Sequence, residues 1–292
     1  MTKDTETDPS AEPGQIETDP SVEPGQIEPV DLRFSEDELA DVRDHLVSFI
    51  REQTDAAGVD EVVLGLSGGI DSSSTASLAV EALGAENVHG LVMPGAVSTE
   101  ENMSDAEVLA EDLGISFDVV EINPFVNTLL DTFPEAEDDR LAVGNARART
   151  RAVVNYLVAN HQGAMVLGTG NRTEAAIGYF TKYGDGAVDC HPIGNLYKQQ
   201  VRQLARDLGV REEFVTKTPT AGLWAGQTDE EEIGMDYDTL DAIIALHIDG
   251  HVPAEATARI ADTTLENVEH VADLHAKSEH KRQVPPAPDP LF

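Results

Sequence analysis

The stretch that decides the fold is an apolar run that leads into a glycine-rich turn; it reads EVVLGLSGGIDSSS and occupies residues 61–74. Residues 61–66 predict a short buried strand, and residues 70–83 predict a helix. The alternation continues, with strands predicted at 88–92, 117–122 and 164–167 and helices at 98–113 and 139–160. This order indicates a doubly wound α/β fold with a parallel sheet. Ligands of such sheets bind beyond the carboxyl ends of the strands, where this turn falls.

The turn itself carries the groups that hold phosphates. Gly68 and Gly69 permit a tight turn and let a ligand approach the backbone closely. The serine hydroxyls and the free N–H groups of the following helix predict a pyrophosphate cradle, with Asp71 placed to hold Mg²⁺ against the phosphates. The stretch contains neither GxxxxGK[ST] nor GxGxxG. The alternative interpretation is a plain strand–helix turn in which Asp71 is a first-turn helix acid.

Longer motifs connect the chain to a known family. SGGIDS at 67–72 resembles the SGGxDS signature of the ATP pyrophosphatase superfamily, whose members adenylate a substrate. GTGNRTE at 168–174 and GYFTKYGDGAVD at 178–189 resemble the ammonia-dependent NAD synthetase family, as do PTAGLW at 219–224 and SEHKRQVP at 278–285. The resemblance spans about residues 36–286. It implies an adenine nucleotide α-hydrolase-like, Rossmann-like sheet with a helical C-terminal part, and amidation of deamido-NAD with ammonia at the expense of ATP.

The resemblance also implies the site residues. The expected ATP-binding residues are Gly65, Leu66, Ser67, Gly68, Gly69, Ile70, Asp71, Ser72, Thr169, Lys198 and Thr220. The expected deamido-NAD-binding residues are Arg149, Lys182, Asp189, His280 and Lys281. Asp71 and Glu174 are the expected ligands of Mg²⁺, and Asp185 is the candidate that receives the ammonium proton. On the residues alone, Glu174 could instead be a helix-terminal acid and Asp189 an Asx-turn residue.

The charge balance is strongly acidic. The chain has 19 Lys and Arg against 55 Asp and Glu, so its formal charge is 19 − 55 = −36. A field of this sign disfavours nucleic-acid phosphates and anionic lipid as partners. It favours a salt-adapted source such as a halophilic archaeon, because salt screens the self-repulsion; the alternative is an ordinary acidic enzyme. Cations retained in such a chain are expected to meet specific anions.

The first residues differ from the rest in composition. Residues 7–17 and 18–28 are a direct repeat with one change, and they are rich in Pro, Gly and acids. We therefore predict a disordered acidic repeat tail at 1–32 and a single synthetase domain at 33–292, helical beyond about 210. Such a tail leaves no room for a glutamine-hydrolysing domain, so ammonia is the expected nitrogen donor. No apolar stretch is long enough to span a bilayer, which favours a soluble cytoplasmic protein.

The single cysteine, Cys190, excludes disulfides within the chain and stands beside His191. Adjacent residues on an extended segment point apart, so a Cys–His nucleophile is disfavoured.

The predicted helix at 139–160 suggests a homodimer. Val154, Leu157 and Val158 are expected on one side, and Arg149 and Tyr156 on the other. A helix with apolar or aromatic groups on two sides often packs on both. The second partner is expected to be a second subunit, with the dinucleotide near the seam; the alternative is the C-terminal segment of the same chain.

Two rival functions stay open at this point. One is another adenylating amidotransferase of the same superfamily, and the other is a nucleotide-binding regulatory protein without turnover. The second would be expected to lose catalytic acids, yet Asp71, Glu174 and Asp185 are all present.

Overall fold

The computed structural model describes residues 30–291 apart from 97, 99, 221, 223, 225 and 226. Most of the predicted tail, residues 1–29, lies outside this part. The N-terminal elements are α1 (Glu36–Ala57), β1 (Val62–Leu66), α2 (Ile70–Leu83), η1 (Ala85–Asn87), β2 (Val88–Val92), α3 (Glu100–Leu113), β3 (Ser116–Val119), α4 (Asn123–Thr132), η2 (Pro134–Ala136), α5 (Arg140–Gln162) and β4 (Met165–Val166). The C-terminal elements are α6 (Arg172–Ile177), α7 (Lys198–Asp207), α8 (Glu212–Val215), α9 (Asp229–Ile233), α10 (Tyr237–Ile243), the π-helix η3 (Ile244–Asp249), α11 (Ala254–Ile260) and α12 (Leu265–Arg282).

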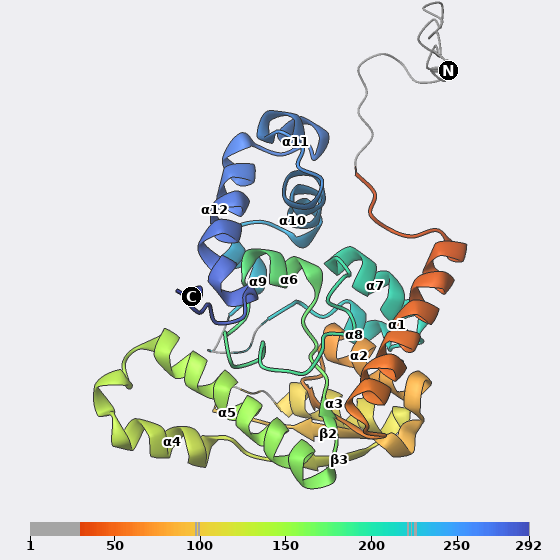
Figure 1. Cartoon of the computed structure of the whole chain (residues 1–292), viewed down its shortest axis with the longest axis vertical. Helices are drawn as coiled ribbons and strands as arrows, with labels where there is room; N and C mark the ends of the chain where they lie inside the picture. The colour runs from red at the N-terminus through yellow and green to blue at the C-terminus, as the bar shows by residue number, and fades with distance from the viewer. Residues whose placement is uncertain are drawn as a thin grey trace, which may run out of the picture.

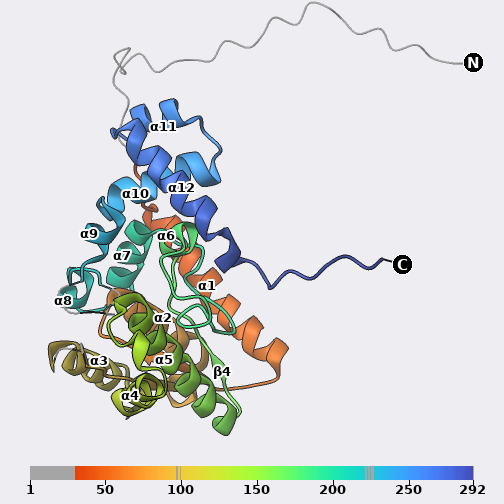
Figure 2. The same cartoon turned by 90° about the vertical axis from the view of Figure 1, so that its left-hand side faces the viewer.

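The predicted parallel sheet is confirmed. Its strand order is β3-β2-β1-β4, and every pair is parallel. The central strand β1 pairs with β2 on one side and with β4 on the other, so the turn after β1 lies between the ends of both neighbours. Figures 1 and 2 show helices α10–α12 stacked above this α/β body, with α6 and α7 between them.

Two hydrophobic layers bury the sheet. The face that carries Val62, Leu64 and Leu66 packs against residues of α2 and α3. The face that carries Val63 packs against α4 and α5, including the buried Val154 of α5. Because residues of β1 are buried on both faces, the strand reads as a continuous apolar run, as parallel strands do.

The strand boundaries differ from the sequence prediction at two places. The strand expected at 117–122 is β3, Ser116–Val119, after which only single hydrogen bonds continue the pairing: the Val120 amide to the Val92 carbonyl (2.8 Å) and the Ile122 amide to the Pro94 carbonyl (2.9 Å). β2 itself ends at Val92, so no ladder can form beyond it. The strand expected at 164–167 is reduced to Met165 and Val166, which pair with β1, while Leu167 forms an isolated bridge with Cys190.

Helix α4 was not predicted. It starts at Asn123. Pro124 is tolerated in the first turn because the amide hydrogen that proline lacks would have no partner inside the helix there. The helices expected at 70–83 and 139–160 correspond to α2 and α5, and a capping box of Ser35 and Glu38 starts α1. Among the described residues, no helix is both long enough and apolar enough to cross a bilayer.

Candidate active site

The turn after β1 has the geometry of an anion cradle. Gly68 adopts φ +70°, a left-handed conformation that glycine tolerates. The Ser67 and Ser72 hydroxyls lie 3.1 Å apart, and the Ser72 hydroxyl donates to the Gly69 carbonyl at 3.0 Å. Among the described residues, no side chain caps the N-terminus of α2, so the amide groups of its first turn are available to a ligand.

Three charged side chains meet beside this turn, and we call Asp71, Glu174 and Lys198 the charge cluster. The Lys198 Nζ lies 2.6 Å from an Asp71 carboxylate oxygen and 3.2 Å from one of Glu174. The Lys198 side chain is only 2% exposed. The cluster joins α2, α6 and α7, so it unites three predicted site residues that are up to 127 positions apart.

The electrostatics of the charge cluster leave it short of positive charge. Burial, opposed by Lys198 and reinforced by Asp71, raises the pKa of Glu174 to about 7. Burial lowers the pKa of Lys198, but the two carboxylates outweigh it and the net pKa is raised. One ammonium group cannot neutralise two carboxylates, which is why burial still disfavours the ionised form of Glu174.

These residues fit a divalent cation. The Asp71 and Glu174 carboxylates converge on one positive centre, the Lys198 ammonium. Mg²⁺ typically takes one or two carboxylates and completes its shell with water and substrate phosphates. Over the described ranges no group of three or more His, Cys, Asp or Glu side chains is placed to hold a metal alone. Phosphate oxygens from a bound nucleotide would therefore have to complete the shell.

A polar support behind the charge cluster was missed by the sequence reasoning. Asn171 caps α6, accepts from the Glu174 amide at 3.0 Å and donates to Asp71 at 2.9 Å. The fully buried Asp241 accepts from the Gln199 amide at 2.9 Å and from the Thr173 hydroxyl. Burial raises the pKa of Asp241 to about 6, against the hydrogen bonds it accepts. Asn171 followed three residues later by Glu174 is a helix-start signal that the sequence displays.

The predicted dinucleotide residues gather in a second group, around residues 178–186. An Arg149 guanidinium nitrogen donates to the Lys182 carbonyl at 3.2 Å, and the Lys182 ammonium donates to the His280 carbonyl. The Lys281 ammonium donates to the carbonyls of Gly178 (2.7 Å) and Phe180 (2.8 Å). We call Arg149, Lys182 and Lys281 the basic rim. None of the three forms an ion pair with a described carboxylate.

Two aspartates of the 178–189 motif differ in their surroundings. Asp185 is solvent-accessible and accepts the Thr181 amide at 2.9 Å, while the protein packed around its carboxylate raises the pKa by desolvation. Asp189 has both oxygens engaged, one by the Tyr156 hydroxyl (2.9 Å) and one by the Val166 amide (2.8 Å). Asp189 thus ties α5 to β4, in addition to any contact with a ligand.

Comparison with known proteins decides the family. The NAD synthase family model matches residues 42–285. The chain belongs to the NAD synthase family.

Individual relatives agree with this membership. The NH(3)-dependent NAD(+) synthetase of Halobacterium salinarum is 65% identical over 260 residues, which are 89% of this chain and 97% of the relative. A structure of NMN synthetase from Francisella tularensis superposes with a TM-score of 0.76 at 34% identity, over 89% of this chain and 100% of the other. An NH3-dependent NAD synthetase from Campylobacter jejuni in complex with the nitrate ion gives 0.73 at 28% identity, over 86% and 99%.

In this NAD synthase family member, two further expected residues lie in segments outside the helices and strands. Thr169 follows the C-terminal end of β4. Thr220 is exposed, and its hydroxyl accepts from the Gly222 amide at 3.1 Å. Residues 221 and 223 of the PTAGLW motif lie outside the described residues. Burial, followed by the Asp189 charge, raises the pKa of Cys190 to about 11, so its thiol is a poor nucleophile at neutral pH.

The face assignment on α5 was wrong in part. Leu157 was expected on the inner side and Tyr156 on the outer side. Instead Leu157 is 68% exposed, whereas Tyr156 packs against the core that contains Val154. Arg149 does face outward as predicted, so it shares an exposed line with Val153 and Leu157 at intervals of four residues.

Proposed function

We propose that this chain amidates deamido-NAD with ammonia, consuming ATP and releasing AMP and pyrophosphate. The observation that carries the proposal is the division of the site. An under-neutralised charge cluster stands beside an anion cradle, and a separate basic rim forms no ion pair with a described carboxylate. The first half suits a metal–nucleotide, and the second suits an anionic dinucleotide.

In the nucleotide half, the chain positions ATP and offsets its charge. The turn at 65–72 and the α2 amides hold the phosphates, while Thr169 and Thr220 contact the nucleotide. Asp71 and Glu174 would hold Mg²⁺, whose charge would offset that of the phosphates and of the pyrophosphate leaving group. Lys198 then turns from its carboxylate partners toward a phosphate oxygen. The nicotinate carboxylate attacks the α-phosphorus, and the bond to pyrophosphate breaks.

In the dinucleotide half, Arg149, Lys182 and Lys281 meet the phosphates and ribose of deamido-NAD, together with His280 and Asp189. Ammonia attacks the resulting acyl-adenylate, and AMP leaves with the electron pair of the broken C–O bond. Asp185 accepts a proton from the nitrogen that has attacked, since the raised pKa of its carboxyl makes it a stronger base than an ordinary aspartate.

A second candidate substrate is nicotinate mononucleotide, because one structural relative is called an NMN synthetase. The 65% identical relative favours the dinucleotide. The test is product analysis by liquid chromatography after the protein is mixed with ATP, Mg²⁺ and ammonium and with either acceptor. We expect NAD and AMP in equal amounts. NMN as the preferred product would show that nicotinate mononucleotide is the substrate. If AMP formed with neither deamido-NAD nor nicotinate mononucleotide as acceptor, the proposed function would be wrong. Efficient NAD formation from ammonia-free glutamine would contradict ammonia as the donor.

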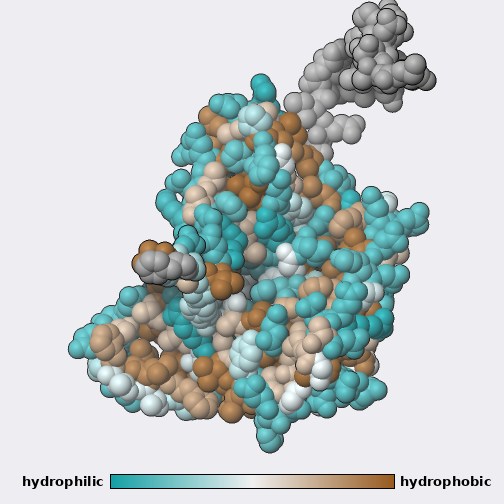
Figure 3. Space-filling model, viewed as in Figure 1, coloured by the Kyte–Doolittle hydropathy of each residue, from teal (hydrophilic) through white to brown (hydrophobic). Residues whose placement is uncertain are grey.

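We further propose a homodimer whose interface includes α4 and α5. Large hydrophobic residues of this region stand exposed: Phe125, Leu129, Phe133, Leu141, Val153 and Leu157. Figure 3 shows hydrophobic atoms gathered on the lower part of the molecule, where α4 and α5 lie. Such a patch is a common mark of an interface. Arg149 lies on the same line of α5, which would place the basic rim at the seam.

Light scattering tests the dimer. In molar KCl we expect twice the 31.3 kDa mass of one chain. Leu157→Glu should shift the mass toward that of a monomer and weaken deamido-NAD binding, because it places a charge in an apolar interface. Tyr156→Glu is unsuitable, since Tyr156 also holds Asp189. The control is Leu291→Glu, at an even more exposed leucine near the C-terminus. A fully active monomer would contradict the proposal. A cytoplasmic location stays a prediction.

A further inference from the structure

Helix α6 is too short to hold its own position, yet it carries Glu174. It has six residues, and isolated helices of that length are unstable in water. Its N-terminal end is tied to Asp71 through Asn171. At its C-terminal end, the last carbonyls lack partners inside the helix and need hydrogen-bond donors from outside it.

The last turns of α12 supply those partners. Arg282 donates to the carbonyls of Ala175 (3.1 Å) and Ala176 (2.9 Å) and, through its other terminal nitrogen, to His275 (2.6 Å) within α12. His275 donates to the Ala176 carbonyl at 2.7 Å. These basic groups stand at the negative end of the α6 dipole, where cations stabilise a helix.

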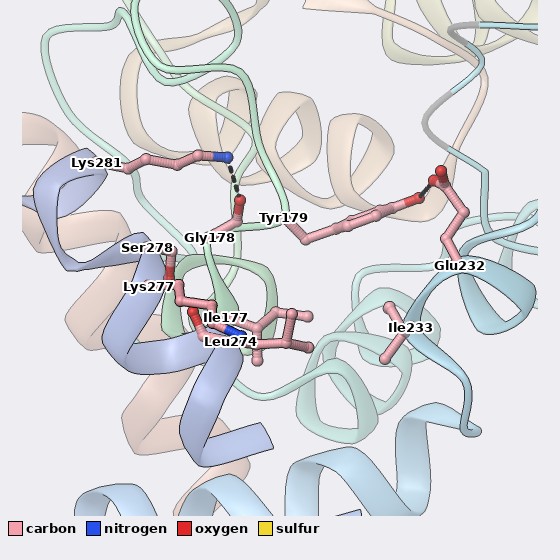
Figure 4. A pocket seen from close by; sticks show the side chains of 9 residues that line it. All are labelled: Ile177, Gly178, Tyr179, Glu232, Ile233, Leu274, Lys277, Ser278 and Lys281. Carbon is pink, nitrogen blue, oxygen red and sulfur yellow. Dashed lines mark hydrogen bonds between the residues drawn. The ribbon is translucent and has the colours of Figure 1, made fainter. Parts of the chain in front are cut away.

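The C-terminal end of α6 also packs closely against the Ser278 side chain of α12. Gly178 ends α6 with φ +69°, and a Cβ atom placed there would lie 2.1 Å from the Ser278 Cβ. Figure 4 shows Ser278 and Lys281 of α12 facing this end of α6, with Lys281 bonded to the Gly178 carbonyl. The contact forms one wall of a 290 Å³ cavity. The position of α6 is therefore set from outside the helix.

We propose that Arg282 is a positioning residue for the charge cluster: by fixing the C-terminal end of α6, it fixes the Glu174 carboxylate relative to Asp71. The inference rests on the proposed function for its link to Mg²⁺, but the mechanical part stands on the contacts alone. A guanidinium can address several carbonyls from one planar group, whereas an ammonium is a single point charge.

Two readouts on four proteins test this. They are the wild type, Arg282→Ala, Arg282→Lys and the control Lys277→Ala; Lys277 lies on the same helix but only pairs with Asp273 at the surface. Hydrogen exchange reports on the amides of 172–178, and the Mg²⁺ dependence of pyrophosphate release reports on Glu174. In Arg282→Ala we expect exchange in α6 to accelerate about tenfold and half-saturating Mg²⁺ to rise about tenfold, the size typical of lost support behind a metal ligand. Arg282→Lys should fall between, and Lys277→Ala should match the wild type.

Unchanged exchange in α6 would overturn the proposal. Faster exchange with an unchanged Mg²⁺ requirement would also overturn it, because Arg282 would then stabilise the helix without positioning Glu174. If Arg282→Ala does not fold, Arg282→Lys decides on the same two readouts. If the wild-type protein releases no pyrophosphate, the proposed function is wrong. Hydrogen exchange needs no turnover, so it would still test whether Arg282 fixes the C-terminal end of α6.

Discussion

Lys198 and Lys182 are both lysines of the site, yet their partners differ in kind. Lys198 is buried and faces two carboxylates. Lys182 is half-buried, and its ammonium donates to a neutral carbonyl. The charge of Lys198 is therefore compensated within the protein, while that of Lys182 is not.

The difference separates two tasks. Under the proposed function, a metal–nucleotide would replace the ionic partners that Asp71, Glu174 and Lys198 already have, so no new charge would enter the interior. The cations of the basic rim are held by carbonyl contacts, and their positive charge would meet the proposed anionic dinucleotide. Pre-oriented donors of this kind reduce the ordering cost of binding.

The largest effect is expected from removing the acids of the charge cluster. Asp71→Asn and Glu174→Gln keep the side-chain size but lose the negative charge that holds the metal. Each should lower the rate of pyrophosphate release by about 10²–10³-fold, the range for losing a preorganised electrostatic contact. Rapid-quench measurement of pyrophosphate checks this, with Glu52→Gln on the exposed face of α1 as control. Near-normal release in either variant would remove the metal assignment.

A matched pair of lysine replacements separates the two regions. Lys198→Met leaves two partly buried carboxylates without the buried cation between them, so the free energy of unfolding should fall by about 3 kcal/mol. Lys182→Met should change stability by less than about 1 kcal/mol, because it removes no ion pair. Urea titrations of both variants give the comparison. Equal destabilisation of the two would show that the distinction between compensated and uncompensated cations is wrong.

Salt should act on stability and binding in opposite directions. Rising KCl screens the self-repulsion of the −36 chain, so the melting temperature should increase from low to molar salt. The same screening weakens the attraction of the basic rim for an anion, so the KM for deamido-NAD should rise several-fold. Both are measured over one KCl series. A melting temperature that falls with salt would contradict the account of the acidic surface.

The smallest effect is expected at Cys190. Because the pKa of its thiol is raised to about 11, the reactive thiolate is rare below about pH 9 and increases as pH rises toward 11. Alkylation by iodoacetamide should be slow at pH 8 and accelerate above pH 10, and Cys190→Ser should keep kcat within about twofold. A variant without activity would revive the Cys–His nucleophile that adjacency of Cys190 and His191 suggests.

Much of the site was predictable because its motifs are local. The turn at 67–72 and the 178–189 motif each lie in one continuous stretch, and their neighbours follow from the order of parallel strands. The contact of Lys198 with two acids was not predictable. It depends on where α7 packs, and the sequence has no strong helix-start signal before α7. In the structure, Asp241 of α10 accepts the Gln199 amide in the first turn of α7, although the two residues are 42 positions apart.

The errors have a related cause. Leu157 and Tyr156 are adjacent, and periodicity alone assigned each to the wrong side of α5. Tyr156 packs against the core that contains Val154, and its hydroxyl donates to Asp189, which accepts the Val166 amide of β4. Leu157 is exposed within one chain, which is compatible with the proposed dimer interface. If α5 packs on two sides, a periodicity rule for one buried face cannot assign its residues correctly.

Calorimetric titration of deamido-NAD, without ATP or Mg²⁺, tests the two-region account most directly. The proteins are the wild type, Glu174→Gln and Lys182→Met. The account predicts equal Kd values for the first two and a Kd about tenfold higher for Lys182→Met, which corresponds to the loss of one charge-assisted hydrogen bond. Loss of affinity in Glu174→Gln, or unchanged affinity in Lys182→Met, would contradict the assignment of the dinucleotide to the basic rim.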